Sequence, residues 1–136
     1  MTDTLSPEQR RERMQRVRSR DTKPERRLRA LVWRLGYRYR KNNVAVTGKP
    51  DLSFKGRKRA IFLHGCFWHR HDCPSGRRIP KSRVEFWTAK FEANVARDAE
   101  VQGRLIAAGW QSLVIWECDL SDEAEVSRRV QVFLNA

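Results

Sequence analysis

Acidic residues are few relative to basic residues in this sequence, and this imbalance narrows the range of partners. Only 16 of the 136 residues are Asp or Glu, whereas 29 are Lys or Arg, so the formal net charge is +13. A surplus of this size favours a polyanionic partner, because each contacted phosphate releases condensed counterions. We therefore expect nucleic acid as the partner, with a membrane surface as the competing polyanion.

Long apolar runs are also lacking. No run reaches the length of about 18 residues that a membrane span requires, and the N-terminus has no apolar signal core. We therefore expect a cytoplasmic protein without a membrane partner. The composition, 40% hydrophobic, predicts one globular domain over residues 21–136. Residues 1–20 are rich in arginine and form either a solvated basic helix or an arm that orders on nucleic acid.

Cysteine and histidine are rare, with three of each, yet five of these six residues fall within His64–Cys73. Three cysteines cannot all pair with one another, and the spacing favours a metal over a disulfide, in a reducing compartment. Thiolate and imidazole ligands suit tetrahedral zinc. We select four zinc ligands: Cys66, His71, Cys73 and Cys118. The alternative is a buried, inert Cys118 and a cluster that binds metal adventitiously.

Hydrophobic periodicity predicts an α/β fold. An amphipathic helix follows a Thr22 cap and ends before Gly36, a long helix starts at a capping box at 82–85, and a last helix covers 121–134. Gly and Pro predict a loop without regular structure at 65–81. Strands are predicted at 37–41, 51–54, 60–63 and 110–118. The last two should be parallel, because the long helix connects them.

Two carboxylates are candidates for chemistry. Asp51 opens a strand next to the one that ends at His64, and the preceding helix carries Glu25. Metal-dependent nucleases present a carboxylate in this way, although an ordinary turn aspartate has the same pattern. Asp98, on the long helix, either orients an imidazole such as that of His69 or is an exposed helix charge.

Aromatic residues stand among these candidates. Phe67 and Trp68 lie between the metal ligands and the spare histidines, and a small metal loop cannot bury both. Beside a basic surface they indicate side chains that stack on bases, and Trp87 is a further candidate. For Trp87 a place in the core is equally well supported.

Together these motifs resemble the Vsr family, the very-short-patch repair endonucleases that nick DNA beside thymine–guanine mismatches. The resemblance spans about residues 8–120. It rests on Met14, Arg20–Thr22, Glu25, Gly48–Asp51, Ile61–His69, His71, Cys73, Glu85–Trp87, Asn94–Val95, Arg97–Asp98, Gly109–Trp110 and Val114–Cys118.

The resemblance implies a single restriction-endonuclease-like domain of the PD-(D/E)xK type, with a mixed central sheet flanked by helices and a structural zinc site. It implies Mg²⁺ bound by Asp51 and by the main-chain carbonyl of Leu63. It further implies active-site roles for His64, His69, Asp98 and Glu25, and zinc at the four ligands selected above. DNA contacts are implied for Met14, Arg20, Lys49, Phe67, Trp68 and Trp87, with Met14 as the minor-groove wedge.

From this resemblance we expect a Mg²⁺-dependent, zinc-stabilised endonuclease that nicks one strand 5′ to the thymine of a T·G mismatch, the product of 5-methylcytosine deamination. Its partner would be mismatched double-stranded DNA, bound by a monomer, with an accessory mismatch-repair protein. Leu63 replaces the threonine of the best-known members. A metal ligand from the main-chain carbonyl is still possible with leucine, whereas any role of the threonine hydroxyl is lost. The alternatives are a non-catalytic zinc-stabilised DNA-binding module and a nuclease for duplexes without a mismatch.

Overall fold

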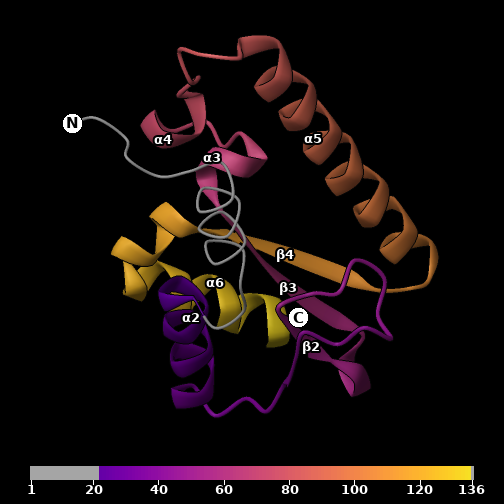
Figure 1. The fold of residues 1–136 in the computed structure, drawn as a ribbon. Helices are drawn as coiled ribbons and strands as arrows, with labels where there is room; N and C mark the ends of the chain where they lie inside the picture. The colour runs from indigo at the N-terminus through magenta and orange to yellow at the C-terminus, as the bar shows by residue number, and fades with distance from the viewer. Residues whose placement is uncertain (1–21, 136) are drawn as a thin grey trace.

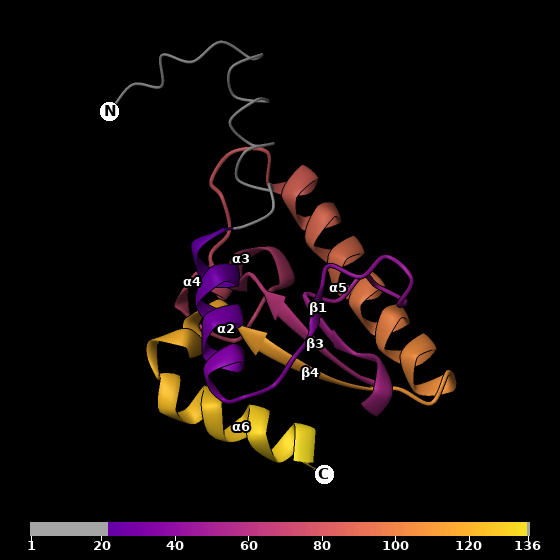
Figure 2. The ribbon, with the colours of Figure 1, turned by 90° about the horizontal axis from the view of Figure 1, so that it is seen from below.

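A computed structural model describes residues 22–135, which form a mixed four-stranded sheet with helices on both faces (Figures 1 and 2). The strand order is β1-β2-β3-β4, with antiparallel pairing up to β3 and parallel pairing of β3 with β4. The strands are β1 (Arg40–Lys41), β2 (Leu52–Phe54), β3 (Arg59–His64) and β4 (Gln111–Trp116). The expected basic arm at 1–20, with Met14 and Arg20, lies outside the described residues.

Helices α2 (Lys23–Arg34) and α6 (Glu123–Asn135) cover one face of the sheet, and α5 (Val84–Ala107) covers the other (Figure 2). Alternation along β3 explains this division. Ile61 packs into the core under α2 and α6, whereas Ala60 and Phe62 pack with Leu105 of α5. The prediction of a central strand buried on both faces is therefore confirmed. Within residues 22–135, no helix has the length and apolarity of a membrane span.

The α2 helix begins as predicted. The backbone N–H of Glu25 donates to Thr22 Oγ1 at 3.5 Å, so the threonine caps the first turn. Leu28, Leu31 and Val32 form its buried face. Because this face fixes the helix against the sheet, the first turn and Glu25 come to lie at the end of the sheet where β3 finishes.

The prediction of an irregular loop at 65–81 is wrong, because two short helices form there: α3 (Cys66–His69) and α4 (Pro74–Arg77). Gly65 serves as the N-cap of α3, and Pro74 occupies the first turn of α4, where the missing N–H has no intrahelical partner in any case. Glycine and proline here start helices instead of preventing them.

Two further boundaries differ from prediction. The capping box at 82–85 does not form: the N-cap of α5 is Arg83, in a left-handed conformation and without a side-chain cap, and its guanidinium lies 4.3 Å from the Phe86 ring centroid. Strand β4 ends at Trp116, whose N–H donates to Asp119 Oδ2, and a 3-10 helix (Glu117–Ser121) follows. Cys118 therefore lies on that helix and not on the strand.

The first predicted strand, 37–41, is shorter than expected. Only Arg40–Lys41 pairs with β2, with Arg40 opposite Ser53 and Lys41 opposite Leu52. β1 is an edge strand and its partner has only three residues, so there is little backbone to pair with.

Candidate active site and metal centre

Two adjoining cavities open at the C-terminal end of β3. The larger, about 810 Å³, lies between α2, α3 and α5. The smaller, about 250 Å³, lies between the segment that precedes β2, the end of β3 and α5. Four residues line both cavities: Leu63, His69, Asn94 and Arg97. Most of the predicted catalytic residues gather at or beside this junction.

Asp51 is held at the junction by the backbone of β3. Its Oδ2 accepts a hydrogen bond from Leu63 N at 2.6 Å. Burial raises the pKa of Asp51 to about 6; the hydrogen bond from Leu63 opposes this rise and the nearby carboxylate of Glu25 adds to it. Arg29 forms an ion pair with Glu25 at 3.6 Å.

This carboxylate environment fits a divalent cation. A bound cation would relieve the repulsion between Asp51 and Glu25 and favour the charged form of Asp51. The N–H and C=O of one strand residue point to the same side of the strand. The carbonyl of Leu63 therefore faces the side of Asp51, as a joint ligand role requires.

A second group consists of two stacked imidazoles and one carboxylate. Asp98 Oδ2 lies 2.6 Å from His69 Nδ1, and Asp98 Oδ1 lies 4.0 Å from His64 Nε2. The two imidazole rings stack at a centroid distance of 4.0 Å and an angle of 7°. A carboxylate at Nδ1 favours the proton on that nitrogen, which leaves Nε2 of His69 able to accept another.

His64 differs from His69 in its burial. Only 8% of His64 is exposed, and this burial lowers its pKa to about 4, with His69 acting in the same direction and Asp98 against it. His64 is therefore neutral at pH 7. The in-plane lone pairs of nearly parallel, stacked rings lie in two separate planes, and one metal ion cannot lie in both planes at once. The pair is therefore better arranged for acid–base chemistry than for sharing one metal ion.

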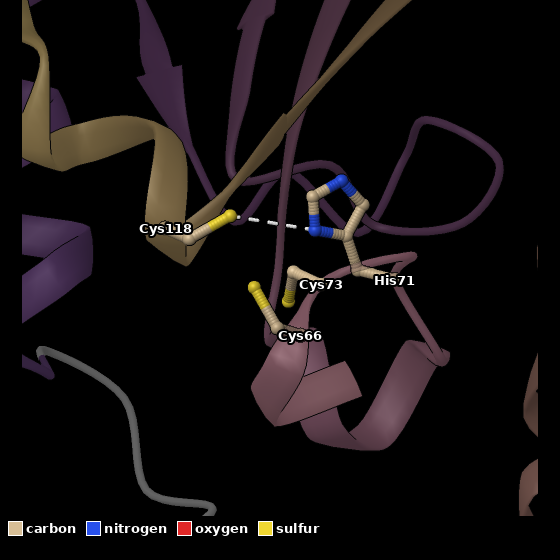
Figure 3. Close-up of side chains that lie close together, drawn as sticks. All are labelled: Cys66, His71, Cys73 and Cys118. Atoms are coloured by element: carbon tan, nitrogen blue, oxygen red, sulfur yellow. Dashed lines mark hydrogen bonds between the residues drawn. The ribbon is translucent and has the colours of Figure 1, made fainter. Parts of the chain in front are cut away.

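The predicted zinc ligands come together from three segments (Figure 3). One ligand atom from each of Cys66, His71, Cys73 and Cys118 lies within 4.8 Å of all the others, and Cys118 Sγ is 3.4 Å from His71 Nδ1. Tetrahedral zinc with such ligands needs separations of about 3.5–3.8 Å. The donor set and its spacing therefore fit this ion.

The surroundings of the four ligands are prepared for a metal. Burial raises the pKa of the Cys66 thiol to about 12, so a metal bound there would displace a proton. The N–H of Gly76 donates to Cys73 Sγ at 3.3 Å and lowers the pKa of that thiol. A Cβ at Gly76 would overlap the His71 carbonyl, so only glycine lets α4 approach this closely. The His71 ring stacks on Trp116 at 4.3 Å.

The aromatic candidates form a partly buried cluster. Phe67, Trp68 and Trp87 are each half-buried, and α5 supplies the cover, since Phe67 lies 5.1 Å from the buried Phe91 and Trp68 lies 5.7 Å from Trp87. The expectation that Phe67 and Trp68 are both exposed is therefore too strong. Trp68 lines the larger cavity, whereas Phe67 lies behind it, beside Cys66 and Cys118.

Four cavity residues were given no site role from the sequence: Lys90, Asn94, Arg97 and Glu117. The last three of them lie in the motifs that carry the resemblance. Asn94 Nδ2 donates to the Trp68 carbonyl at 3.1 Å and so ties α3 to α5. The available signal was the helical spacing of residues 86, 90, 94, 97 and 101, which places them on one stripe of α5. Lys49, a predicted DNA contact, lines the smaller cavity.

The sequence is similar to known DNA endonucleases. The family profile described as DNA mismatch endonuclease Vsr matches residues 2–75. Over 135 residues the chain is 46% identical to the type II nicking enzyme V.XorIIP of Xanthomonas oryzae pv. oryzae, covering 99% of this chain and 98% of that enzyme. Over 134 residues it is 37% identical to the DNA mismatch endonuclease Vsr of Escherichia coli, covering 94% of this chain and 85% of that enzyme.

A solved structure shares the fold. The catalytic domain of the homing endonuclease I-Bth0305I superposes with a TM-score of 0.59 at 22% sequence identity, covering 83% of this chain and 94% of that one. The restriction-endonuclease-like α/β fold expected from the sequence is thereby confirmed.

The raised pKa of Asp51 predicts a pH-dependent stability. The folded protein holds the proton of the Asp51 carboxyl more tightly than the unfolded chain does. The contribution of Asp51 to the free energy of unfolding is therefore lost as the pH rises from about 4 to about 6. Asp51→Asn cannot titrate and does not show this loss. At pH 7 and without Mg²⁺, the free energy of unfolding of this variant should therefore exceed that of the wild type by up to about 3 kcal/mol more than it does at pH 4. Urea unfolding across this range measures the difference. Asp72→Asn, at an 89% exposed side chain, is the control, and an Asp51→Asn difference that stays constant with pH would contradict the assignment.

Proposed function

The chain belongs to the Vsr family of DNA mismatch endonucleases, and from that premise we propose that it nicks one strand of duplex DNA 5′ to the thymine of a T·G mismatch in a Mg²⁺-dependent reaction. The relatives named above support nicking and mismatch recognition. One observation carries the proposal: Asp98 holds the imidazole of His69 beside Asp51, at the junction of two cavities large enough for a DNA backbone.

Each proposed catalytic residue has a separate role in the reaction. His69 accepts the proton of the attacking water through Nε2, and Asp98 stabilises the imidazolium that forms. His64, which is neutral, donates a hydrogen bond to the scissile phosphate. Asp51, Glu25 and the Leu63 carbonyl would hold Mg²⁺, which supplies charge stabilisation to the phosphoryl group when it is bound.

Mismatch selectivity would come from the aromatic cluster. A mispaired step is weakly stacked, so the insertion of a flat side chain there costs less than in paired duplex. Trp68 lines the cavity and would enter first, supported by Phe67 and Trp87. Met14 would act from the minor groove, and Arg20 and Lys49 would contact the DNA backbone.

The four Cys and His ligands would hold one structural Zn²⁺, which joins the α3–α4 segment to the 3-10 helix after β4. The proposal further includes a basic arm at 1–20 on an endonuclease domain at 21–136, a monomeric state and an accessory mismatch-repair protein. A reducing cytoplasm suits the three free thiols.

The decisive experiment uses end-labelled duplexes that differ only in T·G versus C·G at one position, with and without Mg²⁺. We expect a single nick 5′ to the mismatched thymine, only with Mg²⁺ and only in the T·G duplex. Asp51→Ala should abolish nicking yet bind the T·G duplex with nearly wild-type affinity, because the wedge and the basic surface remain. Binding without nicking by the wild type would support a DNA-binding module, and equal nicking of both duplexes would support a nuclease without mismatch specificity.

Zinc should be present at one ion per chain. Cys118→Ser should lose the ion and lower the melting temperature, since the site ties the α3–α4 segment to the end of the sheet. Elemental analysis of protein purified without chelator measures the zinc content of the wild type and of Cys118→Ser. His69→Ala is the control: it should keep zinc and lose nicking rate. Wild-type protein without zinc would remove this part of the proposal.

The wedge assignment predicts that Trp68→Ala lowers the T·G over C·G binding preference about tenfold, because stacking on a base contributes about 1–3 kcal/mol. Trp33, 51% exposed on α2 and not among the cavity residues, gives a matched control. Trp33→Ala should keep the preference. Dissociation constants for the two duplexes and melting temperatures decide the matter. A large loss of stability in Trp68→Ala with an unchanged preference would assign Trp68 to the core.

A further inference from the structure

The proposed reaction adds negative charge where the site is already acidic. Attack on phosphorus gives a pentacovalent transition state with more charge on its non-bridging oxygens than the phosphodiester has. Asp51 and Asp98 line the smaller cavity, and Glu25 lines the larger. A permanent cation near the junction would offset both the repulsion in the ground state and the charge that develops.

Arg97 is placed to supply that charge. Among the described residues, Arg97 is the single Lys or Arg that lines both cavities, whereas Lys90 lines only the larger and Lys49 only the smaller. The other residues common to both include His69 and Leu63, the proposed base and the proposed carbonyl ligand. Arg97 therefore lies on α5 beside the place where the reacting phosphate would bind.

The described part of the fold does not use this guanidinium for an internal contact. Within residues 22–135 no hydrogen bond or ion pair joins Arg97 to another side chain, and its side chain is exposed. Two of the acidic neighbours already have partners: Asp98 interacts with His69 and His64, and Glu25 with Arg29. A further carboxylate, Glu117, lines the larger cavity and forms no ion pair with Arg97. An arginine that no described carboxylate neutralises, in a cavity lined by carboxylates, suits an anionic ligand.

We propose that Arg97 binds the non-bridging oxygens of the scissile phosphate and stabilises the pentacovalent transition state. This role rests on the proposed endonuclease function. In the step, the water oxygen forms a bond to phosphorus while His69 takes its proton. The bond from phosphorus to the leaving sugar oxygen breaks, and that oxygen takes a proton from solvent. The planar guanidinium can donate two parallel hydrogen bonds to phosphate oxygens, a geometry that the lysine ammonium lacks.

The test compares wild type with Arg97→Ala, Arg97→Lys and Arg104→Ala. Arg104 lies two turns further along α5, exposed and ion-paired with Glu100, and is outside both cavities. At saturating enzyme with Mg²⁺, Arg97→Ala should lower the single-turnover nicking rate about 100-fold or more, as loss of one transition-state donor does. The nicking rate of Arg97→Lys should lie between those of Arg97→Ala and the wild type, and the rate of Arg104→Ala should equal that of the wild type. All four proteins should have the same melting temperature.

Binding without Mg²⁺ separates this inference from the proposed function. Loss of one phosphate contact should reduce the slope of log Kd against log salt by about 0.9 for Arg97→Ala, on T·G and C·G duplexes alike. Arg104→Ala should leave the slope unchanged. A wild type that fails to nick would count against the proposed function, with the salt slope still reporting on Arg97. An unchanged slope, or an Arg97→Ala rate equal to that of the wild type at saturation, would overturn the role.

Discussion

β3 and β4 run parallel, and this pairing decides which side chains can meet at the active end of the sheet. His64 lies opposite Trp116, so both strands finish at the same level. Cys66 and Cys118, far apart in sequence, therefore emerge side by side, and a metal can join them. The same end carries His64 and His69. The proposed zinc ligands and the proposed catalytic groups share one edge because the same pair of strands leads to both.

Burial of polar groups at this edge gives each its chemical character. Asp51 is partly buried and lies near Glu25, so its charged form is disfavoured. A bound cation would offset this effect. His64 is buried and stays neutral, while Asp98 orients His69. The two histidines stack on each other but differ in exposure. This difference is the basis for the separate roles proposed for them, His64 as a hydrogen-bond donor and His69 as a proton acceptor.

The long helix α5 contributes little to the core, since only Phe91 and Leu105 of its 24 residues are buried. Its remaining length forms the wall of the cavities and covers the aromatic cluster. Most of α5 therefore buries little apolar surface and remains exposed, where a DNA backbone can reach it. The attachment of α5 through Asn94 and the carbonyl of Trp68 keeps that wall in register with the histidines.

Local signals in the sequence were sufficient for the elements that depend on neighbouring residues. The Thr22 cap, the apolar face of α2 and the buried run that becomes β3 all follow from periodicity and hydrogen-bond chemistry within a few positions. The rare Cys and His residues also identified the four members of the metal group, because few other ligands were available to choose from.

Only the tertiary structure decided how the separate segments meet. The close packing of α4 on the chain after α3 depends on the contact between Gly76 and the backbone of His71, which Gly and Pro content cannot reveal. The stacking of His64 on His69 depends on how α3 folds back against the end of β3, and the places of Asp98 and Arg97 beside these rings depend on how α5 packs on the sheet and on α3. Sequence spacing shows which residues lie on the same face of a helix, but only tertiary packing determines what that face contacts.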